Sequence, residues 1–589
     1  MPHRSSKMIL KTTRKYMNSC YVVLGVIIAA LGSICLVFAR PFIERFIDYN
    51  LQLRPNAEIT KMWSHPDVNV SIDFYFFNWT NSEEFYYMKT KPKVNQIGPI
   101  SYTEVPVKKI FKWHPENNTM DYGKTHYYYL DEKRTVVSLN DTLISINALM
   151  AAAASKSRNW AYLKRTLIDM ALKFYKNGAI WKRTVDEFFF KGFNDDIVNL
   201  LAVLPTSMRT SLGLFMPWDR IGYAYARNAT SEFLGKHSIH TGVGDIDRLG
   251  ELMLWKGKNY SEAFSEGCNA VHGSPGEFQR THLKKHESID YFFTDFCRAL
   301  KMDYLDEVYI DGIRGYRYII SPSVFDNGTL YPESKCYCNG ECVPYGVFNI
   351  TSCYFGLPVL VSKPHFLGAD PYYAQQVEGM EPNKTWHETL ITLEPRTGLM
   401  IEIKGRLQLN IYVRPTSHII SFPTKRKMAF PVVWFDMYAG ISKDSARILS
   451  MVQNAPFYAN IMGLCLMLLG IVIACWQPCR DMWNRRSVQH MEINRLNHDD
   501  DYDEEMDHVD VNLKSGTIGK QVGRKILSRE NLFGLRSNFP SLVYITTHPR
   551  RSLPIIISHL DGDEEAWKSC LEDEMRQQSE LALDEGSSS

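Results

Sequence analysis

Six cysteines in the middle of the chain have the clearest chemistry of any residues in the sequence. The 589 residues include 12 cysteines, and half of them fall within 86 residues: Cys268, Cys297, Cys336, Cys338, Cys342 and Cys353. An even number of clustered cysteines is typical of a disulfide framework in an exported protein. We therefore expect three disulfides, whose pairing the spacing alone leaves open. A zinc site at Cys336, Cys338 and Cys342 is the alternative, which an oxidising compartment disfavours.

Nine Asn-x-Ser/Thr triplets are candidate acceptors for N-glycosylation. They are Asn69, Asn78, Asn117, Asn140, Asn228, Asn259, Asn327, Asn349 and Asn383. Each triplet alone is a weak signal, because such triplets also arise by chance. The last 110 residues contain none of them, however. Their confinement to one part of the chain indicates that this part is exported.

A run of basic residues between Met150 and Val185 is suited to attracting anions. Its eight cations are accompanied by a single acid, Asp169; the cations are Lys156, Arg158, Lys164, Arg165, Lys173, Lys176, Lys182 and Arg183. A solvated helix face normally mixes both signs of charge, whereas this segment concentrates positive potential. From the residues alone, an anion-attracting surface and an ordinary solvated face both remain open.

The same run has the period of an amphipathic helix. At about 100° per residue, one stripe is apolar and the opposite side is charged. The apolar residues are Leu163, Leu167, Met170, Ala171 and Phe174. Such a stripe is more typical of core packing than of a lipid site, so we expect it to be buried.

Catalytic motifs are present only as fragments. The segment Gly273–Gly276 lacks the pattern of a nucleophile elbow. Glu287 follows His282 and His286, whereas a zinc protease needs the acid between its two histidines. Gly242–Gly244 lacks the further glycine and the lysine of a phosphate-binding loop. We therefore expect no enzyme activity, no metal site and no cofactor.

Two long apolar segments divide the chain. The first has 24 uncharged residues between Lys15 and Arg40, and the second lies between Arg447 and Arg480. A helix of about 20 apolar residues is long enough to cross a bilayer. A cleaved signal peptide is the rival interpretation of the first segment, but its apolar region would be shorter. We expect two transmembrane helices.

Flanking charges predict the orientation of these helices. Residues 1–15 carry a charge of +5, and three arginines follow the second apolar segment closely. The positive-inside rule then places both termini in the cytoplasm. The predicted parts are a cytoplasmic N-terminus (1–18), a first span (19–39), an ectodomain (40–454), a second span (455–477) and a cytoplasmic tail (478–589).

Alternating residues predict that strands dominate the ectodomain. From Met400 to Ile411, mostly polar and mostly apolar positions alternate, which is typical of an antiparallel ladder with one buried face. The segment Val68–Trp79 is rich in β-branched and aromatic residues, as strands are. Residues 145–204 instead favour helices. We expect an α+β ectodomain in which a helical segment is inserted among antiparallel strands.

Several of these segments, in order, resemble the class B scavenger receptor family. The resemblance is carried by QIGPISYTE (Gln96–Glu104), FKWHPENNTMDY (Phe111–Tyr122), SLGLFMPW (Ser211–Trp218), GIRGYRYIISP (Gly312–Pro322), CYC (Cys336–Cys338), KPHFL (Lys363–Leu367) and LEPRTGLMIEIKGRLQLNIYV (Leu393–Val413). Each element alone is a weak motif, but the ordered set between two spans is highly specific.

The resemblance implies an irregular antiparallel β-barrel with an apical helical bundle and an apolar tunnel that carries lipid towards the bilayer. It implies the disulfides Cys268–Cys336, Cys297–Cys353 and Cys338–Cys342. The basic segment corresponds to the ligand-facing apex, with Lys164, Arg165, Lys173 and Lys176 as candidate ligand residues. The expected function is a scavenger receptor or lipid transporter for lipoproteins, fatty acids, other lipids or polyanionic ligands. An endolysosomal receptor for a luminal protein is the alternative.

Three departures from the family pattern leave ligand choice and trafficking open. The segment Val271–Arg280 differs from the family text, the segment between Cys338 and Cys342 is short, and the tail is unusually long. Blocks of like charge in the tail, such as His498–Asp510 with eight acids, are typical of disorder.

The cytoplasmic side offers candidates for modification and for partners. Cys20, Cys475 and Cys479 lie near membrane edges and are candidates for palmitoylation, with unmodified thiols as the alternative. A cytoplasmic adaptor at the tail and a homo-oligomer stay open, and we expect no nucleic-acid partner. We expect residence in the plasma membrane, with the endosomal or lysosomal membrane as the second option.

Overall fold

The computed structural model describes residues 2–506 except 67, 69, 88–89, 176–177, 204, 206, 208–217, 232–233, 277, 339 and 423–425. Side chains are described from residue 19 to residue 491, with further gaps at 85–87 and 477. The chain separates into two units, 1–493 and 494–589, and the first holds both apolar segments and the ectodomain. Asn69, Lys176 and the tail beyond residue 506 therefore lie outside the described residues.

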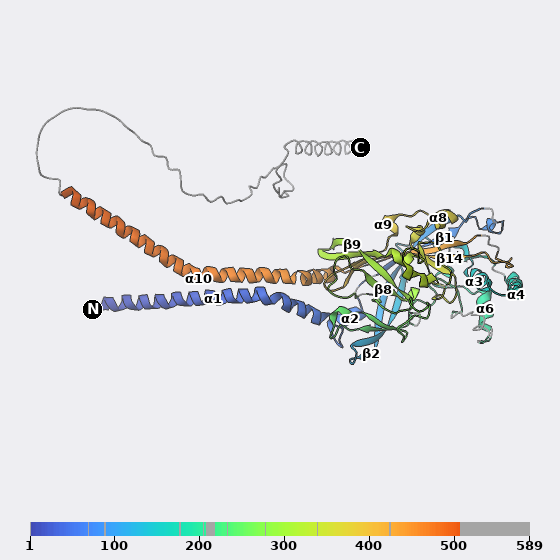
Figure 1. Ribbon diagram of the computed structural model, residues 1–589, viewed down its shortest axis with the longest axis horizontal. Coiled ribbons are helices and arrows are strands. Elements are labelled where there is room, and N and C mark those ends of the chain that lie inside the picture. Colours follow the sequence, from blue (N-terminus) through green and yellow to red (C-terminus); the bar gives the residue numbers. More distant parts are fainter. Residues whose placement is uncertain are drawn as a thin grey trace, which may run out of the picture. The chain divides into compact units, whose positions relative to one another are not determined.

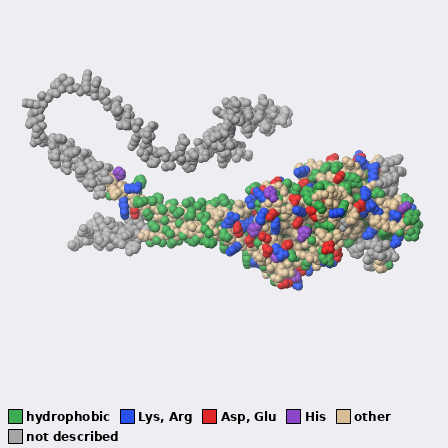
Figure 2. Space-filling model, viewed as in Figure 1, with side chains coloured by type: hydrophobic (Ala, Val, Ile, Leu, Met, Phe, Trp, Pro, Cys, Tyr) green, Lys and Arg blue, Asp and Glu red, His purple; other side chains and the backbone are tan. Residues whose placement is uncertain are grey.

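Two long helices contain the apolar segments. They are α1 (Pro2–Leu51) and α10 (Lys443–Met506), and the part of α10 nearer the ectodomain runs beside α1 in Figure 1. Their parts Ser19–Leu51 and Lys443–Met491 are apolar and long enough to cross a membrane. Most of their apolar side chains face outward and form the hydrophobic band along the helices in Figure 2. Both predicted spans are thus found as helices with a surface suited to lipid.

Glycines bring α1 and α10 into backbone contact. A Cβ atom on Gly25 would lie 2.5 Å from the backbone nitrogen of Ala474, and one on Gly32 would lie 2.4 Å from that of Met467. Gly470 of α10 approaches the backbone of Ala29 in the same way. In a membrane, helices associate mainly through such close packing at small residues. The pairing of the two helices therefore depends on these glycines.

Replacing Gly32 by leucine is expected to separate the two helices, because the new side chain has no room beside Met467. The thiol of Cys35 lies 3.7 Å from the carbonyl oxygen of Ala459, so Ala459→Cys should form an oxidative cross-link with it. We expect Gly32→Leu to lower the cross-link yield by about fivefold, measured by mass spectrometry of the full chain. Ile27→Leu on the outward face is the matched control. An unchanged yield in Gly32→Leu would contradict the contact.

One large antiparallel sheet forms the body of the ectodomain. Its strands are β1 (Val70–Trp79), β2 (Val94–His114), β3 (Thr119–Leu130), β6 (Lys236–His240), β7 (Leu252–Trp255), β8 (Ile289–Phe293), β9 (Arg298–Ile310), β10 (Ile313–Ile320), β11 (Val347–Asn349), β12 (Val359–Ser362), β13 (Leu390–Leu393), β14 (Met400–Val413) and β15 (Met428–Gly440). The main path runs β7-β6-β3-β2-β1-β15-β14-β13-β10-β9-β8, and β12 joins β11 to β14.

A short segment joins the two edges of this sheet into a nearly closed barrel. Strand β7 donates a backbone hydrogen bond to the carbonyl of Gly273 at 2.8 Å. Next to it, Ser274 donates to the carbonyl of Asp290 at 3.0 Å and accepts from Phe292 in β8 at 2.8 Å. Gly273 has φ +81°, and a Cβ atom there would lie 2.6 Å from the carbonyl oxygen of Asp290. Gly273 and Ser274 belong to the segment Val271–Arg280, which departs from the family pattern. This segment thus covers both edges of the sheet, so that neither edge strand is left exposed there.

The period of two in β14 holds only in its first half. Residues 400–405 alternate between half-buried and buried, but Gln408 and Asn410 are fully buried too. The side-chain oxygen of Gln408 accepts from the backbone nitrogen of His365 at 2.7 Å, and Asn410 Nδ2 donates to Ser362 Oγ at 3.0 Å. The expectation of one buried face is wrong for the second half, because β12 and the residues after it cover the polar face.

The predicted helical segment is present, with one interruption. The shorter helices are α2 (Glu58–Ser64), α3 (Ala148–Ser157), α4 (Tyr162–Lys173), α5 (Val185–Phe188), α6 (Asp196–Val203), α8 (Pro371–Gln376) and α9 (Lys384–His387). Helices α3, α4 and α6 lie at the end of the ectodomain opposite α1 and α10, which we call the apex (Figure 1). Strand β5 (Ile180–Thr184) interrupts the helices and pairs with β4 (Thr142–Ile146), because Trp181 enters the core while Lys182 faces solvent.

Candidate functional site at the apex

The six clustered cysteines form three disulfides in the structure. They join Cys268 to Cys336, Cys297 to Cys353 and Cys338 to Cys342, with Cα–Cα distances of 5.8, 5.9 and 4.7 Å. These separations lie in the usual range for disulfides. The pairs are those that the family resemblance implies, and the sulfurs are bonded to one another rather than arranged as zinc ligands.

The candidate glycosylation sites differ in exposure. Among the eight whose side chains are described, five are exposed: Asn117, Asn140, Asn228, Asn259 and Asn383. The other three, Asn78, Asn327 and Asn349, are half-buried. The Nδ2 atom of Asn327, to which a glycan would attach, donates a hydrogen bond to the carbonyl of Val343 at 2.9 Å. Glycosylation stays a prediction, as does palmitoylation of Cys20, Cys475 and Cys479, whose side chains are exposed.

Helix α4 presents its apolar stripe to solvent, and this corrects the expectation that the stripe is buried. The side chains of Leu163, Leu167 and Phe174 are 68%, 57% and 85% exposed. Tyr162, Met170 and Ala171 are exposed as well. Figure 2 shows hydrophobic side chains gathered at the end of the ectodomain where α4 lies in Figure 1. We call these six exposed residues of the α4 region the apical face.

A buried acid explains why α4 turns this way. Asp169, the single acid of the basic run, accepts from the backbone nitrogen of Ser421 at 2.8 Å, and the Ser421 hydroxyl donates to its carbonyl at 3.1 Å. Burial alone would raise the pKa of Asp169, but the Ser421 bonds and the charge of Lys173 hold it below its ordinary value. With Asp169 and Leu172 turned inward, the apolar stripe faces outward.

Three of the four candidate ligand cations lie among the described residues, and they differ in exposure and in their partners. Lys164 is exposed, whereas Arg165 is half-buried and donates to Ser417 Oγ at 2.6 Å. Lys173 Nζ lies 3.5 Å from Asp169 Oδ2, so an ion pair offsets part of its charge. Lys176 lies outside the described residues. Of the three described cations, Lys164 is therefore the one best placed to meet a ligand.

Sequence reasoning missed a charge cluster that fixes α3 beside the Cys338–Cys342 disulfide. Glu341, in the shortened loop between these cysteines, lies 3.0 Å from Arg158, 2.6 Å from Arg414 and 2.7 Å from Lys427. Burial would raise the pKa of Glu341, but hydrogen bonds from Lys427 and Arg414 outweigh it and lower the pKa to about 2. Arg158, which belongs to the basic run, is therefore a structural cation.

An apolar cavity of about 80 Å³ lies beneath the apical helices. Its wall includes Leu149 of α3, Phe188 of α5, Trp218, Leu409 of β14 and Val432 of β15. These elements come from the helical segment and from the barrel, so the cavity lies where the two meet. A continuous tunnel, which the family resemblance implies, stays a prediction.

Comparison with known proteins finds a matching family and several relatives of this chain. The family model described as the CD36 family matches residues 23–480, which include the whole ectodomain and most of the apolar part of each long helix. The chain belongs to the CD36 family. Members of the CD36 family are scavenger receptors and lipid transporters rather than enzymes, and the resemblance to class B scavenger receptors is thereby confirmed.

Three relatives show the range of the CD36 family around this chain. Protein peste of Drosophila melanogaster is 31% identical over 469 residues, covering 78% of this chain and 82% of its own. Lysosome membrane protein 2 of Homo sapiens is 28% identical over 473 residues, covering 78% and 95%. Scavenger receptor class B member 1 of Bos taurus is 25% identical over 474 residues, covering 78% and 90%. The relatives of this chain thus include both a protein named for the lysosome membrane and one named as a scavenger receptor.

Two histidines of this CD36-family ectodomain are buried face to face. The rings of His365, from the KPHFL segment, and His387 stack with centroids 4.6 Å apart. His365 Nδ1 accepts from the backbone nitrogen of Glu381 at 3.0 Å, so its Nε2 carries the proton and donates to Gln96 Oε1 at 2.8 Å. Burial lowers the pKa of both histidines to about 4. The neighbouring His387 contributes to the lower pKa of His365, and the charge of Arg406 contributes to that of His387.

Acid is expected to destabilise the ectodomain through this pair. The unfolded chain binds protons near pH 6.5, whereas the folded histidines stay neutral until about pH 4, so stability falls as pH falls between these values. We expect a loss of about 2 kcal/mol for each histidine at pH 4.5. Unfolding free energies of the purified chain at pH 7 and pH 4.5 test this. His387→Gln should remove about half of the loss and exposed His418→Gln none; equal losses in both would contradict the assignment.

Proposed function

We propose that the chain is a scavenger receptor and lipid transporter that docks lipid-bearing particles on the apical face and accepts their apolar cargo. The observation that carries this proposal is the exposed apolar stripe of α4. A soluble monomer rarely leaves such a contiguous apolar patch exposed unless it meets another surface. The patch lies at the end of the ectodomain opposite the membrane helices, where a particle has access (Figure 1).

The chemistry of α4 fits the surface of a phospholipid layer. Helices that lie in such a surface insert an apolar face among the acyl chains and keep lysines at the level of the headgroups. Leu163 and Leu167 of α4, together with Phe174 directly after it, form the apolar face, and Lys164 and Lys173 of α4 are exposed as well. Fully burying one large apolar side chain contributes about 1.5–3 kcal/mol. Two or three such side chains suffice for reversible binding of a particle.

Burial of acyl chains would drive the transfer of cargo, and no covalent chemistry is needed. Each buried CH₂ group contributes about 0.8 kcal/mol. The apolar cavity between the apical helices and the barrel offers a first place for such a chain. The positive charges that flank both spans support a topology in which both termini lie in the cytoplasm. The proposed membrane of residence is the plasma membrane.

The test measures particle binding and lipid transfer separately. Cells that display the full chain receive lipoprotein particles in which the protein and a cholesteryl ester carry different labels. We expect saturable binding of the protein label and uptake of the lipid label in excess of it, both above those of cells without the chain. Binding without excess lipid uptake would contradict transport, and the absence of both would contradict the receptor.

The second candidate is a receptor for a luminal protein in the endolysosomal system. The same apical face supports it, because an apolar helix face also fits a groove on another protein. One relative is named lysosome membrane protein 2, which supports a lysosomal membrane as a possible location for members of the family. This candidate predicts intracellular vesicle staining and a stoichiometric protein partner on purification, whereas the first predicts surface staining and lipid.

A further inference from the structure

The outer face of β3 presents aromatic side chains to solvent. Tyr127 and Tyr129 are 36% and 58% exposed, whereas Tyr128 between them is half-buried, because successive side chains of a strand point to opposite faces. Further along the same face, Phe111 of β2 is 51% exposed. A Cβ atom on Gly123 of β3, which shares the face of Tyr127, would lie 2.9 Å from the Phe111 ring.

Two valines of β2 connect these aromatic side chains. Val105 and Val107 pair with Tyr127 and Thr125 of β3, and both valines are half-buried. Residues directly opposite each other in an antiparallel pair place their side chains on the same face. We call Val105, Val107, Phe111, Tyr127 and Tyr129 the aromatic face. A contiguous apolar surface of this kind usually marks the place where something else covers the protein.

A candidate glycosylation triplet, Asn228 to Thr230, lies at the edge of the aromatic face. The backbone nitrogen of Ala229 donates to the carbonyl of His126 in β3 at 2.9 Å. The side-chain oxygen of Asn228 accepts from the backbone nitrogen of Tyr128 at 3.1 Å. The asparagine that would carry a sugar is therefore fixed beside the strand that presents Tyr127 and Tyr129.

The segment that holds Asn228 is anchored on both sides. Before it, Arg227 forms an ion pair of 2.7 Å with Asp295 and donates to the Tyr354 hydroxyl at 2.9 Å. After it, the Cβ atom of Ser231 lies 3.8 Å from the place that a Cβ atom on Gly123 would occupy. Because the Cβ direction of Gly123 belongs to the outer face of β3, the segment passes along the aromatic face.

The hydrogen bond to Tyr128 also sets the direction of the Asn228 amide. Its oxygen points to the strand, so Nδ2, the atom to which a glycan attaches, points away from it. Asn228 is exposed, and its Nδ2 has no hydrogen bond to any residue that the structure describes. The inner side of β3 is filled here, since the ring of Tyr128 packs 5.2 Å from that of Phe190. A glycan on Asn228 therefore has room only on the outer side.

We propose that Asn228 carries an N-linked glycan whose first sugars lie on the aromatic face and cover Tyr127 and Tyr129. The apolar C–H face of an N-acetylglucosamine ring fits an aromatic ring, and its polar groups can bond the tyrosine hydroxyls. The inference does not depend on the proposed function, because it concerns β2 and β3 of the barrel and not the apical face.

The modification leaves the hydrogen bond that positions Asn228 intact. The donor is an oligosaccharide joined to a lipid through a diphosphate. A bond forms between Nδ2 and C1 of the first sugar, the bond from C1 to the diphosphate oxygen breaks, and Nδ2 loses one proton. The side-chain oxygen of Asn228 takes no part, so it still accepts from the backbone nitrogen of Tyr128.

Hydroxyl-radical footprinting of the full chain, purified from animal cells, tests the proposal. Thr230→Ala removes the triplet but keeps Asn228, whereas Thr230→Ser keeps the triplet and is the matched control. We expect Tyr127 and Tyr129 to be oxidised about fivefold faster in Thr230→Ala than in the original chain or in Thr230→Ser. Tyr309, which is 70% exposed, is the internal reference and should be oxidised at one rate in all three.

The reverse experiment removes the aromatic rings and measures access to the glycan. We expect Tyr127→Ser together with Tyr129→Ser to raise the rate at which peptide N-glycosidase releases the Asn228 glycan from the native chain by about fivefold. Release from the other exposed triplets should not change. Because both tyrosines are exposed, the double variant should unfold at the temperature of the original chain.

Three outcomes would overturn the proposal. The first is a peptide with unmodified Asn228 in the mass spectrum of the original chain. The second is equally fast oxidation of Tyr127 and Tyr129 with and without the triplet, which would show that the glycan does not touch the aromatic face. The third is equally slow oxidation in both, which would show that a second copy of the chain or another protein covers this face.

Discussion

Replacing Glu394 by leucine is expected to lower the free energy of unfolding of the ectodomain by about 4 kcal/mol, the largest effect of any single substitution considered. The carboxylate is 1% exposed. One oxygen accepts from the backbone nitrogen of Thr397 at 2.7 Å and from its hydroxyl at 2.6 Å. The other accepts from the backbone nitrogen of Arg396 at 3.2 Å and from Gln453 Nε2 at 2.8 Å. Leucine leaves these buried donors without an acceptor.

The same substitution should also loosen α10 from the barrel. Gln453 of α10 uses its side chain to bond both the backbone nitrogen and the carbonyl of Arg314 in β10, each at 2.9 Å. Glu394 holds that side chain from the other side. We therefore expect little Glu394→Leu protein to leave the endoplasmic reticulum, because a weakened junction exposes buried polar groups.

Surface display and thermal unfolding measure this effect. Glu132→Leu, at an exposed glutamate, is the matched control and should change stability by less than about 0.5 kcal/mol. Glu394→Gln keeps acceptor capacity and should cost less than leucine. Normal display and an unchanged unfolding temperature in Glu394→Leu would contradict the role of this carboxylate.

Charging the apical face should abolish docking without harming the fold. Leu167→Glu together with Phe174→Glu removes two exposed apolar side chains, each worth about 1.5–3 kcal/mol in a lipid surface. Loss of both corresponds to a fall in affinity of about a hundredfold or more. Because both side chains are exposed, the free energy of unfolding should stay within about 0.5 kcal/mol of the original.

Binding of labelled phospholipid vesicles to cells that display the chain tests this second prediction. Tyr309→Glu is the matched control, since Tyr309 is 70% exposed and lies on the hairpin of β9 and β10, whose Arg314 contacts α10. We expect the control to bind like the original chain. Vesicle binding that survives the double substitution would show that α4 does not dock the particle.

Local sequence signals predicted the two long apolar helices, the strand-rich body and the helical segment correctly, because each prediction rests on the composition or period of neighbouring residues. The orientation of α4 could not be obtained in this way. Its period identified an apolar stripe but not which side of the helix packs. One signal was available: Asp169 is a lone acid among eight cations, and such a residue needs a specific partner, which Ser421 supplies from far along the chain.

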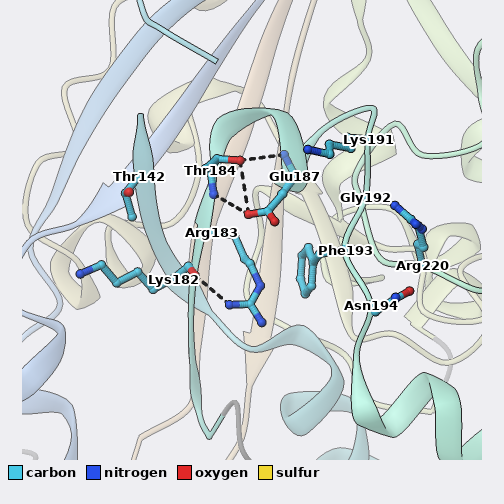
Figure 3. Close-up of a pocket in the computed structure, with 10 residues that line it drawn as sticks. All are labelled: Thr142, Lys182, Arg183, Thr184, Glu187, Lys191, Gly192, Phe193, Asn194 and Arg220. Carbon is cyan, nitrogen blue, oxygen red and sulfur yellow. Dashed lines mark hydrogen bonds between the residues drawn. The ribbon is translucent and has the colours of Figure 1, made fainter. Parts of the chain in front are cut away.

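Other features depend on pairings between distant residues that no local pattern contains. Gln408 and Asn410 occupied polar positions in an alternating strand, yet the segment around His365 covers them. Gly273 belonged to a departure from the family pattern, and it closes the barrel by contact with Asp290. Lys182 and Arg220 likewise line one surface cleft of about 570 Å³ (Figure 3), although they are far apart in the sequence.

Lipid analysis of the purified full chain tests the central claim most directly. The chain is extracted in a detergent with no acyl chain, washed, and its bound lipids are identified and counted by mass spectrometry. The account predicts lipid with acyl or other long apolar chains in at least equimolar amount, and a marked loss when Leu149→Trp fills the apolar cavity. No lipid above the level of a control membrane protein treated alike, or a stoichiometric protein partner in its place, would contradict it.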